Sequence, residues 1–494
     1  MKSHRIYTII IICWLLLIAT FCYDLEKPLI TSYHKDLETF VTVLVATLFI
    51  CYFWLNGLKD IIYTLYFYRF FNKRVLNRKI EGIQPHKNPS IDLVYCTHND
   101  FTPESLLASM KQDYSNYQVI ILDDSTDPLK IEEIKKFSKQ YGVRIIRRDT
   151  RKGHKAGNLN NYLKDSTAEF FVILDSDETI PPDFITHALP YFQDPKIAVV
   201  QGNHVAVENK NQFMKMFADG VESHWYTYQN IKHSFGFLSF LGHGAMIRAS
   251  AYHEIKGFPE LVAEDLCFSI ELRNKGYYVA FAPEIICWEQ FPISYLAFKK
   301  RHAKWTQGNM EFIKSYSLNL LTSPMHWYEK LDIVLFTYSL PLSVFFALYL
   351  IINIIIFPVL HFSPNYPLPM LIPTGVFLLA PMINDIVYFS TRKKHSDLAF
   401  YIVSLVVLYG SLFYLSFRSS FKALFSQAQF IVTPKSNTYI SFRQAVWLNR
   451  GELVFSAFLL SASYLFLRSF LPVILIAIPS ILSVYLTALA NYTI

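Results

Sequence analysis

The stretch that decides the fold is FFVILDSD, residues 170–177. Its first five residues are apolar, as in a strand buried on both faces, and two aspartates follow where that strand would end. On either side of it, short β-rich runs alternate with helical patterns. The alternation predicts an α/β domain with a mostly parallel sheet, whose ligands bind at the carboxyl ends of the strands. The predicted strands are residues 91–97, 119–122, 143–147, 170–174 and 197–201, and the predicted helices are 103–112, 127–141 and 156–163.

Acidic residues follow two of these strands, at the end where a ligand is expected. Asp175 and Asp177 stand two positions apart. Carboxylate oxygens at this spacing can hold Mg²⁺ or Mn²⁺, which in turn binds a diphosphate. Asp123 and Asp124 end another strand and can accept hydrogen bonds from a nucleoside. The alternative is structural, because acidic turns are common and aspartates cap helices. The strand-end positions favour a metal and diphosphate site.

Two further motifs lie at predicted helix starts. In residues 152–160, Lys155 lies among small residues, which suits the close approach of a nucleotide but also suits any helix start. Glu264 and Asp265 precede a predicted helix at residues 266–275. Acids in a first helical turn usually complement the helix dipole, whereas beside an acceptor hydroxyl one of them can act as a general base.

A basic amphipathic segment, residues 295–316, contains the sequence RHAKW at residues 301–305. In one interpretation it is an interface helix, whose basic side chains reach the lipid surface while its tryptophan anchors it. In the other, Trp305 stacks on a sugar and Lys304 meets a phosphate. The motif by itself supports the two interpretations equally.

The composition is that of a membrane protein whose middle part is water-soluble. Of the 494 residues, 52% are hydrophobic and 17% are charged, against about 25% charged in ordinary soluble domains. The net charge of +7 is a mild excess that does not indicate a nucleic-acid partner. The six cysteines include no C-x-x-C pair, which argues against a disulfide scaffold or a zinc site.

Long uncharged stretches at both ends of the chain can cross the hydrocarbon core of a bilayer. Basic residues in short loops stay on the cytoplasmic side, which places both termini and the middle domain in the cytoplasm. Residues 398–417 are equally apolar, but if they crossed, the basic residues from Arg418 to Arg450 would lie outside. We therefore predict that 398–417 lies along the cytoplasmic interface. The six predicted spans are residues 6–23, 40–58, 333–360, 366–384, 453–467 and 469–494.

Taken in order, these motifs resemble those of the family 2 processive glycosyltransferases, and most of all the catalytic subunit of bacterial cellulose synthases. The resemblance covers about residues 75–440 in order and spacing. One piece, FIVTPK at residues 430–435, is similar to the F-x-V-T-x-K gating loop that covers the donor pocket in those synthases. The other matching pieces are Asp123-Asp124, Lys155-Ala156-Gly157-Asn158, Asp175-x-Asp177, Glu264-Asp265, and Trp305 with Gly308 behind it.

The resemblance implies a GT-A-type cytoplasmic domain that uses a UDP-sugar and a divalent metal ion, Mg²⁺ or Mn²⁺. It implies a metal and a basic side chain that stabilise the leaving diphosphate while a carboxylate activates the acceptor hydroxyl. The roles implied are donor binding by Thr97, Asp123, Asp124, Lys155, Asp175, Lys304, Phe430, Thr433 and Lys435, metal binding by Asp175 and Asp177, acceptor binding by Trp305 and Glu264, and general-base catalysis by Asp265.

Two features depart from the family. Where the family has the motif Q-x-x-R-W, this chain has Arg301 in place of the glutamine and Lys304 in place of the arginine. Lysine lacks the bidentate fork of arginine. The chain also ends at Ile494, so we expect it to contain no C-terminal cyclic di-GMP-binding domain. The expected domains are two N-terminal spans at 1–74, the GT-A domain at 75–328 with an interface helix at 294–316, a membrane hairpin at 329–390, the interfacial helix and gating loop at 391–450, and a C-terminal hairpin at 451–494.

The function expected from these features is that of an inverting, processive synthase in the plasma membrane. It would extend a β-linked polysaccharide with sugar from a UDP-sugar, most simply UDP-glucose, and move the chain through its own spans. Accessory subunits or a homo-oligomer are compatible with this function. One alternative is a non-processive transferase that acts on a membrane lipid, and another is a transporter or scaffold whose soluble domain is inert.

Overall fold

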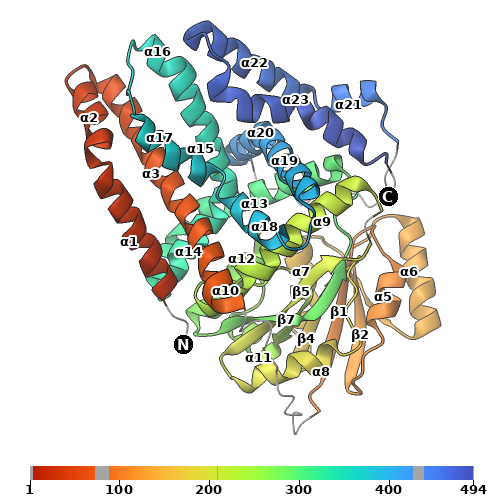
Figure 1. The fold of residues 1–494 in the computed structure, drawn as a ribbon. Helices are drawn as coiled ribbons and strands as arrows, with labels where there is room; N and C mark the ends of the chain where they lie inside the picture. The colour runs from red at the N-terminus through yellow and green to blue at the C-terminus, as the bar shows by residue number, and fades with distance from the viewer. Residues whose placement is uncertain (1–3, 73–87, 209, 427–438, 493–494) are drawn as a thin grey trace.

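A mixed β-sheet forms the centre of the water-soluble domain (Figure 1). The structure, a computed structural model, describes residues 4–72, 88–208, 210–426 and 439–492. In these residues seven strands make one sheet in the order β3-β2-β1-β4-β6-β5-β7. The strands are β1 (Ile91–Thr97), β2 (Tyr117–Asp123), β3 (Arg144–Ile146), β4 (Phe170–Asp175), β5 (Ile197–Ala206), β6 (Ala245–Arg248) and β7 (Tyr278–Glu289).

The first four strands confirm the predicted parallel arrangement. β1 pairs in parallel with both β2 and β4, and β2 pairs in parallel with β3. Every residue of β1 is buried, because helices cover both faces of the sheet. One face packs on α5 (Pro103–Ser109), α6 (Pro128–Tyr141) and α8 (Phe184–Ala188), and the other on α7 (His154–Leu163), α11 (Ala249–Glu254) and α12 (Glu264–Asn274).

The sequence did not predict β6 or β7. β6 has four residues and pairs antiparallel with β4 on one side and β5 on the other. β7 pairs in parallel with β5, and β5 runs five residues beyond its predicted end, to Ala206. The partners of β6 lie far away in sequence, so its own short run contains no signal for its pairing. The turn before it is thereby brought beside the end of β4, where the Gly244 N–H donates to the Ile173 carbonyl at 2.9 Å.

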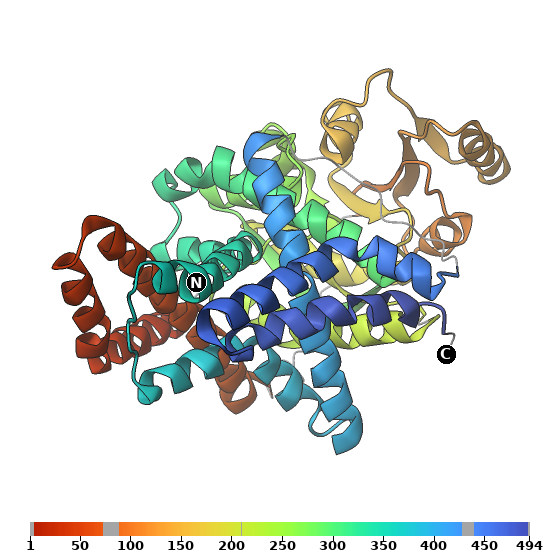
Figure 2. The same ribbon diagram turned by 90° about the horizontal axis from the view of Figure 1, so that it is seen from above.

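Apolar helices gather on one side of the sheet domain (Figures 1 and 2). Within the described residues, four helices are long and apolar enough to cross a membrane, and six candidates result if each of two bent pairs is one span. The four helices are Leu37–Phe71, His395–Phe425, Arg450–Leu467 and Leu471–Leu489, and the bent pairs are α1 (Arg5–Thr20) with α2 (Cys22–Tyr33) and α17 (Leu368–Leu378) with α18 (Pro381–Phe389).

These candidates differ from the predicted spans at two places. The predicted span 333–360 is broken between α14 (Trp327–Thr337) and α15 (Ser339–Ile351), and in the helical run from α15 to Val359 the described residues Val344–Val359 form a shorter apolar helix. Residues 398–417 lie in α19 (His395–Ser411) and α20 (Phe413–Phe425), which together are long and apolar enough to cross. Length and composition do not separate crossing from lying at the interface, so the interfacial placement stays a prediction.

The basic segment forms one long helix, α13 (Tyr295–Thr322), which joins the sheet domain to α19 and α20. Ser294 begins it by accepting a hydrogen bond from a backbone N–H of the first turn. The Tyr295 hydroxyl donates to Ser411 Oγ of α19 at 2.8 Å, and His302 Nε2 lies 2.8 Å from Ser416 Oγ of α20. The helix that carries Trp305 is therefore held directly against α19 and α20.

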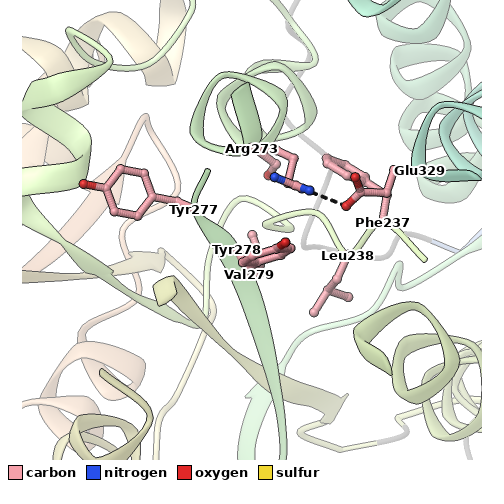
Figure 3. A pocket seen from close by; sticks show the side chains of 8 residues that line it. Phe237, Leu238, Arg273, Tyr277, Tyr278, Val279 and Glu329 are labelled. Atoms are coloured by element: carbon pink, nitrogen blue, oxygen red, sulfur yellow. Dashed lines mark hydrogen bonds and ion pairs between the residues drawn. The ribbon is translucent and has the colours of Figure 1, made fainter. Parts of the chain in front are cut away.

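The helix α12, which begins at Glu264, also contacts the helices that follow α13. Arg273 Nε donates to Glu329 Oε1 at 2.8 Å, which joins the end of α12 to α14 (Trp327–Thr337) (Figure 3). A cavity of about 10 Å³ lies beside this ion pair, between Tyr278 and Phe237. That volume holds about one water molecule, so the cavity is too small for a sugar nucleotide.

Candidate active site

Lys155 and Asp175 form the centre of the site. Lys155 lies in the first turn of α7, and Asp175 is the last residue of β4. The ammonium group of Lys155 donates to Asp175 Oδ1 and, at 2.9 Å, to the backbone carbonyl of Gly242 in the turn before β6. Three segments far apart in sequence thus meet at the carboxyl end of β4, where the sheet topology predicts a ligand.

Asp265 joins this centre from the first turn of α12. Its Oδ1 accepts a hydrogen bond from the Leu266 N–H at 2.7 Å. A methyl group added to Gly242 would lie 3.8 Å from Asp265 Oδ2, so this oxygen faces the turn whose carbonyl holds Lys155. Gly242 has φ +94°, a backbone conformation that favours glycine. The Asp265 carboxylate and the Lys155–Asp175 pair therefore flank the same turn.

The two acids that begin α12 are poised to take up a proton. Burial raises the pKa of both Glu264 and Asp265. The charge of Asp265 raises the pKa of Glu264 further, while Lys155 and Lys304 lower it. A carboxylate with a raised pKa is a better general base near neutral pH than an exposed one.

We expect the raised pKa to appear in the pH dependence of sugar transfer. A general base works only when ionised, so activity should be lost as the pH falls through the pKa of Asp265, which burial raises above the value of about 4 for an exposed aspartate. Glu264→Gln removes a negative neighbour and should move this acid limb to lower pH. The measurement is the turnover number of the purified full chain against pH at saturating donor. Abolition of transfer by Glu264→Gln would instead assign the base to Glu264.

The aspartates at the end of β2 are held by two arginines that follow β3. Asp123 forms an ion pair with Arg147. Asp124 accepts hydrogen bonds from Arg148 Nε and Nη2 at 2.9 and 2.7 Å. Thr97, at the end of β1, accepts the Asp124 N–H through its carbonyl at 3.0 Å, so the predicted nucleoside ligands do lie together. The two arginines were not predicted, although Arg147 is the last residue of the predicted strand 143–147 and Arg148 follows it directly.

The departures from the Q-x-x-R-W motif have a structural consequence on α13. The Arg301 guanidinium lies 4.6 Å from the centre of the Trp305 ring and 3.7 Å from Glu289 Oε1. The Trp305 side chain is 38% exposed, so much of its surface is open to a ligand. Burial lowers the pKa of Lys304, and the charges of Glu264 and Asp175 oppose this shift. Arg301 therefore holds Trp305 in place, and Lys304 interacts with the acids of the centre.

A buried cluster beside Asp175 was not predicted at all. His243, in the turn before β6, has Nε2 3.8 Å from Asp175 Oδ2 and Nδ1 3.2 Å from Glu178 Oε2. His204 and Glu289 complete the cluster from β5 and β7. Burial lowers the pKa of His243, but the nearby carboxylates of Glu178 and Asp175 outweigh it and raise the pKa to about 10. The cluster favours a positive charge, and its members are too scattered in sequence to be recognised.

The predicted diphosphate metal ligands, Asp175 and Asp177, stand where the sequence placed them. The Asp175 side chain is 37% exposed at the strand end, and Asp177 is partly exposed in the following turn. Carboxylate oxygens open to a phosphate ligand fit Mg²⁺ or Mn²⁺. The predicted gating residues Phe430, Thr433 and Lys435 lie outside the described residues.

Comparison with known proteins agrees with this arrangement. Residues 170–383 match the family described as "Glycosyl transferase family group 2". The matched residues include β4 with Asp175, the turn at Gly242 and the start of α12, so this part of the chain is similar to glycosyltransferases of that group. The bacterial cellulose synthase resemblance is not among these findings and stays a prediction.

The chain is similar to two proteins of Arabidopsis thaliana. It is 28% identical to "Glucomannan 4-beta-mannosyltransferase 7" over 235 residues, which are 44% of this chain and 42% of that protein. It is 24% identical to "Probable glucomannan 4-beta-mannosyltransferase 11" over 278 residues, 54% of this chain and 59% of that protein. The chain thus spans about half the length of these relatives. Among solved structures, a Pyrobaculum calidifontis mannosyltransferase in complex with GDP-Man and Mn²⁺ is 16% identical, with TM-score 0.47, over 77% of this chain and 98% of that one.

Proposed function

We propose that the protein is an inverting, membrane-embedded synthase that transfers a hexose from a nucleoside diphosphate sugar to a growing β-linked polysaccharide. The observation that carries the proposal is the turn at Gly242, which has the Lys155–Asp175 pair on one side and the Asp265 carboxylate on the other. The donor diphosphate would bind beside the Lys155–Asp175 pair, and the acceptor hydroxyl would bind beside Asp265. The anomeric carbon of the donor sugar would then lie between the two. That geometry suits direct displacement with inversion.

The donor side of the site contains charged side chains that would bind the nucleoside and the diphosphate. Asp123, Asp124 and Thr97 lie at the end of the sheet where the nucleoside is expected, and Lys155 lies deeper, beside Asp175. A divalent ion held by Asp175 and Asp177 would neutralise the diphosphate as it leaves. Lys304 interacts with Asp175 and Glu264 and would add positive charge from α13.

On the acceptor side, Asp265 would take the proton of the attacking hydroxyl. Its Oδ1 is held by the helix backbone, which orients the carboxylate, while Oδ2 faces the turn. Trp305 offers a partly exposed ring on which the terminal sugar can stack. Glu264 precedes Asp265 in the chain, and when it is ionised its negative charge would raise the basicity of Asp265.

Donor identity is the first thing to test. The sequence resemblance suggests UDP-glucose, whereas the two plant relatives are named as mannosyltransferases, which points to a mannose donor. Membranes that contain the full chain should be given radiolabelled UDP-glucose and, separately, GDP-mannose. We expect a long β-linked polymer from one donor, identified by product size and linkage analysis. A product of one or a few sugars on a lipid would support the non-processive alternative, and no incorporation from any donor would contradict both.

We further propose that the catalytic domain and both termini lie in the cytoplasm, with the protein in the plasma membrane. Loop charges support this topology, and so does the packing of α19 and α20 on α13, since that packing keeps them beside the catalytic domain. A topology reporter fused near residue 436 should report the cytoplasmic side. A reporter that appeared outside would show that residues 398–417 cross the membrane.

A further inference from the structure

Two imidazole rings in the protein core each lie between the same two carboxylates. Glu289 Oε2 lies 3.3 Å from His204 Nδ1 and 3.3 Å from His243 Nε2. On the opposite edges of the rings, Glu178 has one oxygen 3.5 Å from His204 Nε2 and the other 3.2 Å from His243 Nδ1. The His204, Glu178 and Glu289 side chains are 2%, 0% and 9% exposed, so water screens these contacts little.

Two neutral rings cannot satisfy all four of these contacts. A neutral imidazole has one N–H and one lone pair, so two neutral rings donate in two of the four contacts and turn a lone pair toward a carboxylate oxygen in the other two. Within the described residues, Glu178 Oε1 and His243 Nδ1 have no hydrogen-bond partner, and an unsatisfied buried polar group is costly. The cluster needs more positive charge, either as protons on the rings or as a cation.

The distances to Glu289 fit a cation between it and the two rings. In tetrahedral coordination with bonds of about 2.0–2.1 Å to nitrogen and oxygen, neighbouring ligand atoms lie about 3.3 Å apart. Glu178 Oε2, 3.2 Å from His243 Nδ1, would then accept a hydrogen bond from that ring nitrogen, as carboxylates around histidine-bound metals commonly do. His204 Nε2 lies 3.2 Å from Gln201 Nε2 and 3.5 Å from Glu178 Oε1. Asp175 Oδ2 lies 3.8 Å from His243 Nε2.

The nature of the ligand atoms selects the metal. Two imidazole nitrogens and one carboxylate suit zinc, whereas Mg²⁺ prefers oxygen ligands only. The absence of paired cysteines argued against a zinc site in the sequence, but this set of ligands needs no cysteine. Gly244 allows the set to close, because a methyl group added there would clash with both Glu178 Oε1 and His204 Nε2.

We propose that His204, His243 and Glu289 hold a resident zinc ion, oriented by Glu178 and separate from the diphosphate metal at Asp175 and Asp177. The ion ties the ends of β5 and β7 to the turn before β6. That turn contains the Gly242 carbonyl that accepts Lys155. The zinc therefore holds in place the turn whose Gly242 carbonyl positions Lys155 in the donor site.

The test is the metal content of the purified full chain in detergent, measured by mass spectrometry after expression with added zinc. We expect about one zinc per chain, retained through dialysis against a magnesium buffer, and a lower melting temperature after removal by a strong chelator. Glu289→Gln and His204→Gln should lower the zinc content at least about 10-fold. Asp177→Asn is the matched control, because it alters the diphosphate site alone and should keep its zinc.

Several outcomes would overturn the proposal. The first is measured on the unaltered chain and needs no variant. An unaltered chain that carries no zinc would identify the cluster as protonated imidazoles between carboxylates. Cobalt in the unaltered chain should show the spectrum of tetrahedral nitrogen and oxygen ligands. A thiolate absorption, or loss of zinc in Cys287→Ser, would instead assign the ion to the neighbouring group of Glu178, His204 and Cys287. Loss of zinc in Asp177→Asn from a folded chain would merge the two sites and contradict a separate resident ion.

Discussion

Replacement of Asp265 by asparagine is expected to lower the turnover number of sugar transfer by about 10²–10⁴-fold, the usual contribution of a positioned general base. Asparagine has nearly the same shape, and its side-chain oxygen can still accept the Leu266 N–H that Asp265 accepts at 2.7 Å. The start of α12 should therefore persist. What is lost is the ability to take a proton from the acceptor hydroxyl.

Donor binding should survive in Asp265→Asn, because the Lys155–Asp175 pair is untouched. The two measurements are transfer of radiolabelled sugar by the purified full chain and calorimetric binding of the nucleotide to the same preparation. Asp183→Asn is the matched control, since this aspartate is 48% exposed and forms an ion pair with His187 outside the site. Its transfer rate should stay unchanged. Substantial polymer synthesis by Asp265→Asn would falsify the assignment of the base.

Local patterns in the sequence predicted the strands whose own residues are mostly apolar. β1 begins and ends at the predicted residues. β4 extends the predicted strand by one residue, because its apolar run, residues 170–174, lies between the charged residues Glu169 and Asp175 and so contains its own boundaries. β6 was missed for the opposite reason. Its four residues become a strand only because β4 and β5 lie on either side of it, and that pairing is a property of the assembled sheet.

The same distinction holds in the site. Asp175, Lys155 and Asp265 were singled out because each stands at the end of a strand or the start of a helix, and their roles, which the family resemblance implies, stay predictions. The buried cluster was missed because His204, His243 and Glu289 lie on three separate elements. Only the neighbouring strand order β6-β5-β7 brings them together. A single sequence does not encode that neighbourhood in any local pattern.

Replacement of Asp175 by asparagine should damage donor binding as well as transfer. Burial opposes ionisation of Asp175, yet Lys155 and His243 hold its pKa below the ordinary range, so the carboxylate is charged at every working pH. Asparagine therefore removes a full negative charge from the proposed diphosphate metal site, although its side-chain oxygen can still accept from Lys155, which also donates to the Gly242 carbonyl. Loss of a supporting residue around a metal costs about 10–100-fold in metal affinity, and loss of a direct ligand should cost at least as much.

The two aspartate variants should be separable by metal concentration. Weak metal binding can be overcome by mass action, so raising Mn²⁺ should recover part of the transfer and donor binding lost in Asp175→Asn. No concentration of metal restores a missing base, so Asp265→Asn should show no recovery in the same titration. Asp183→Asn again serves as the control and should need no added metal beyond that of the unaltered chain. Equal recovery of both site variants, or of neither, would contradict the division of roles between the strand end at Asp175 and the helix start at Asp265.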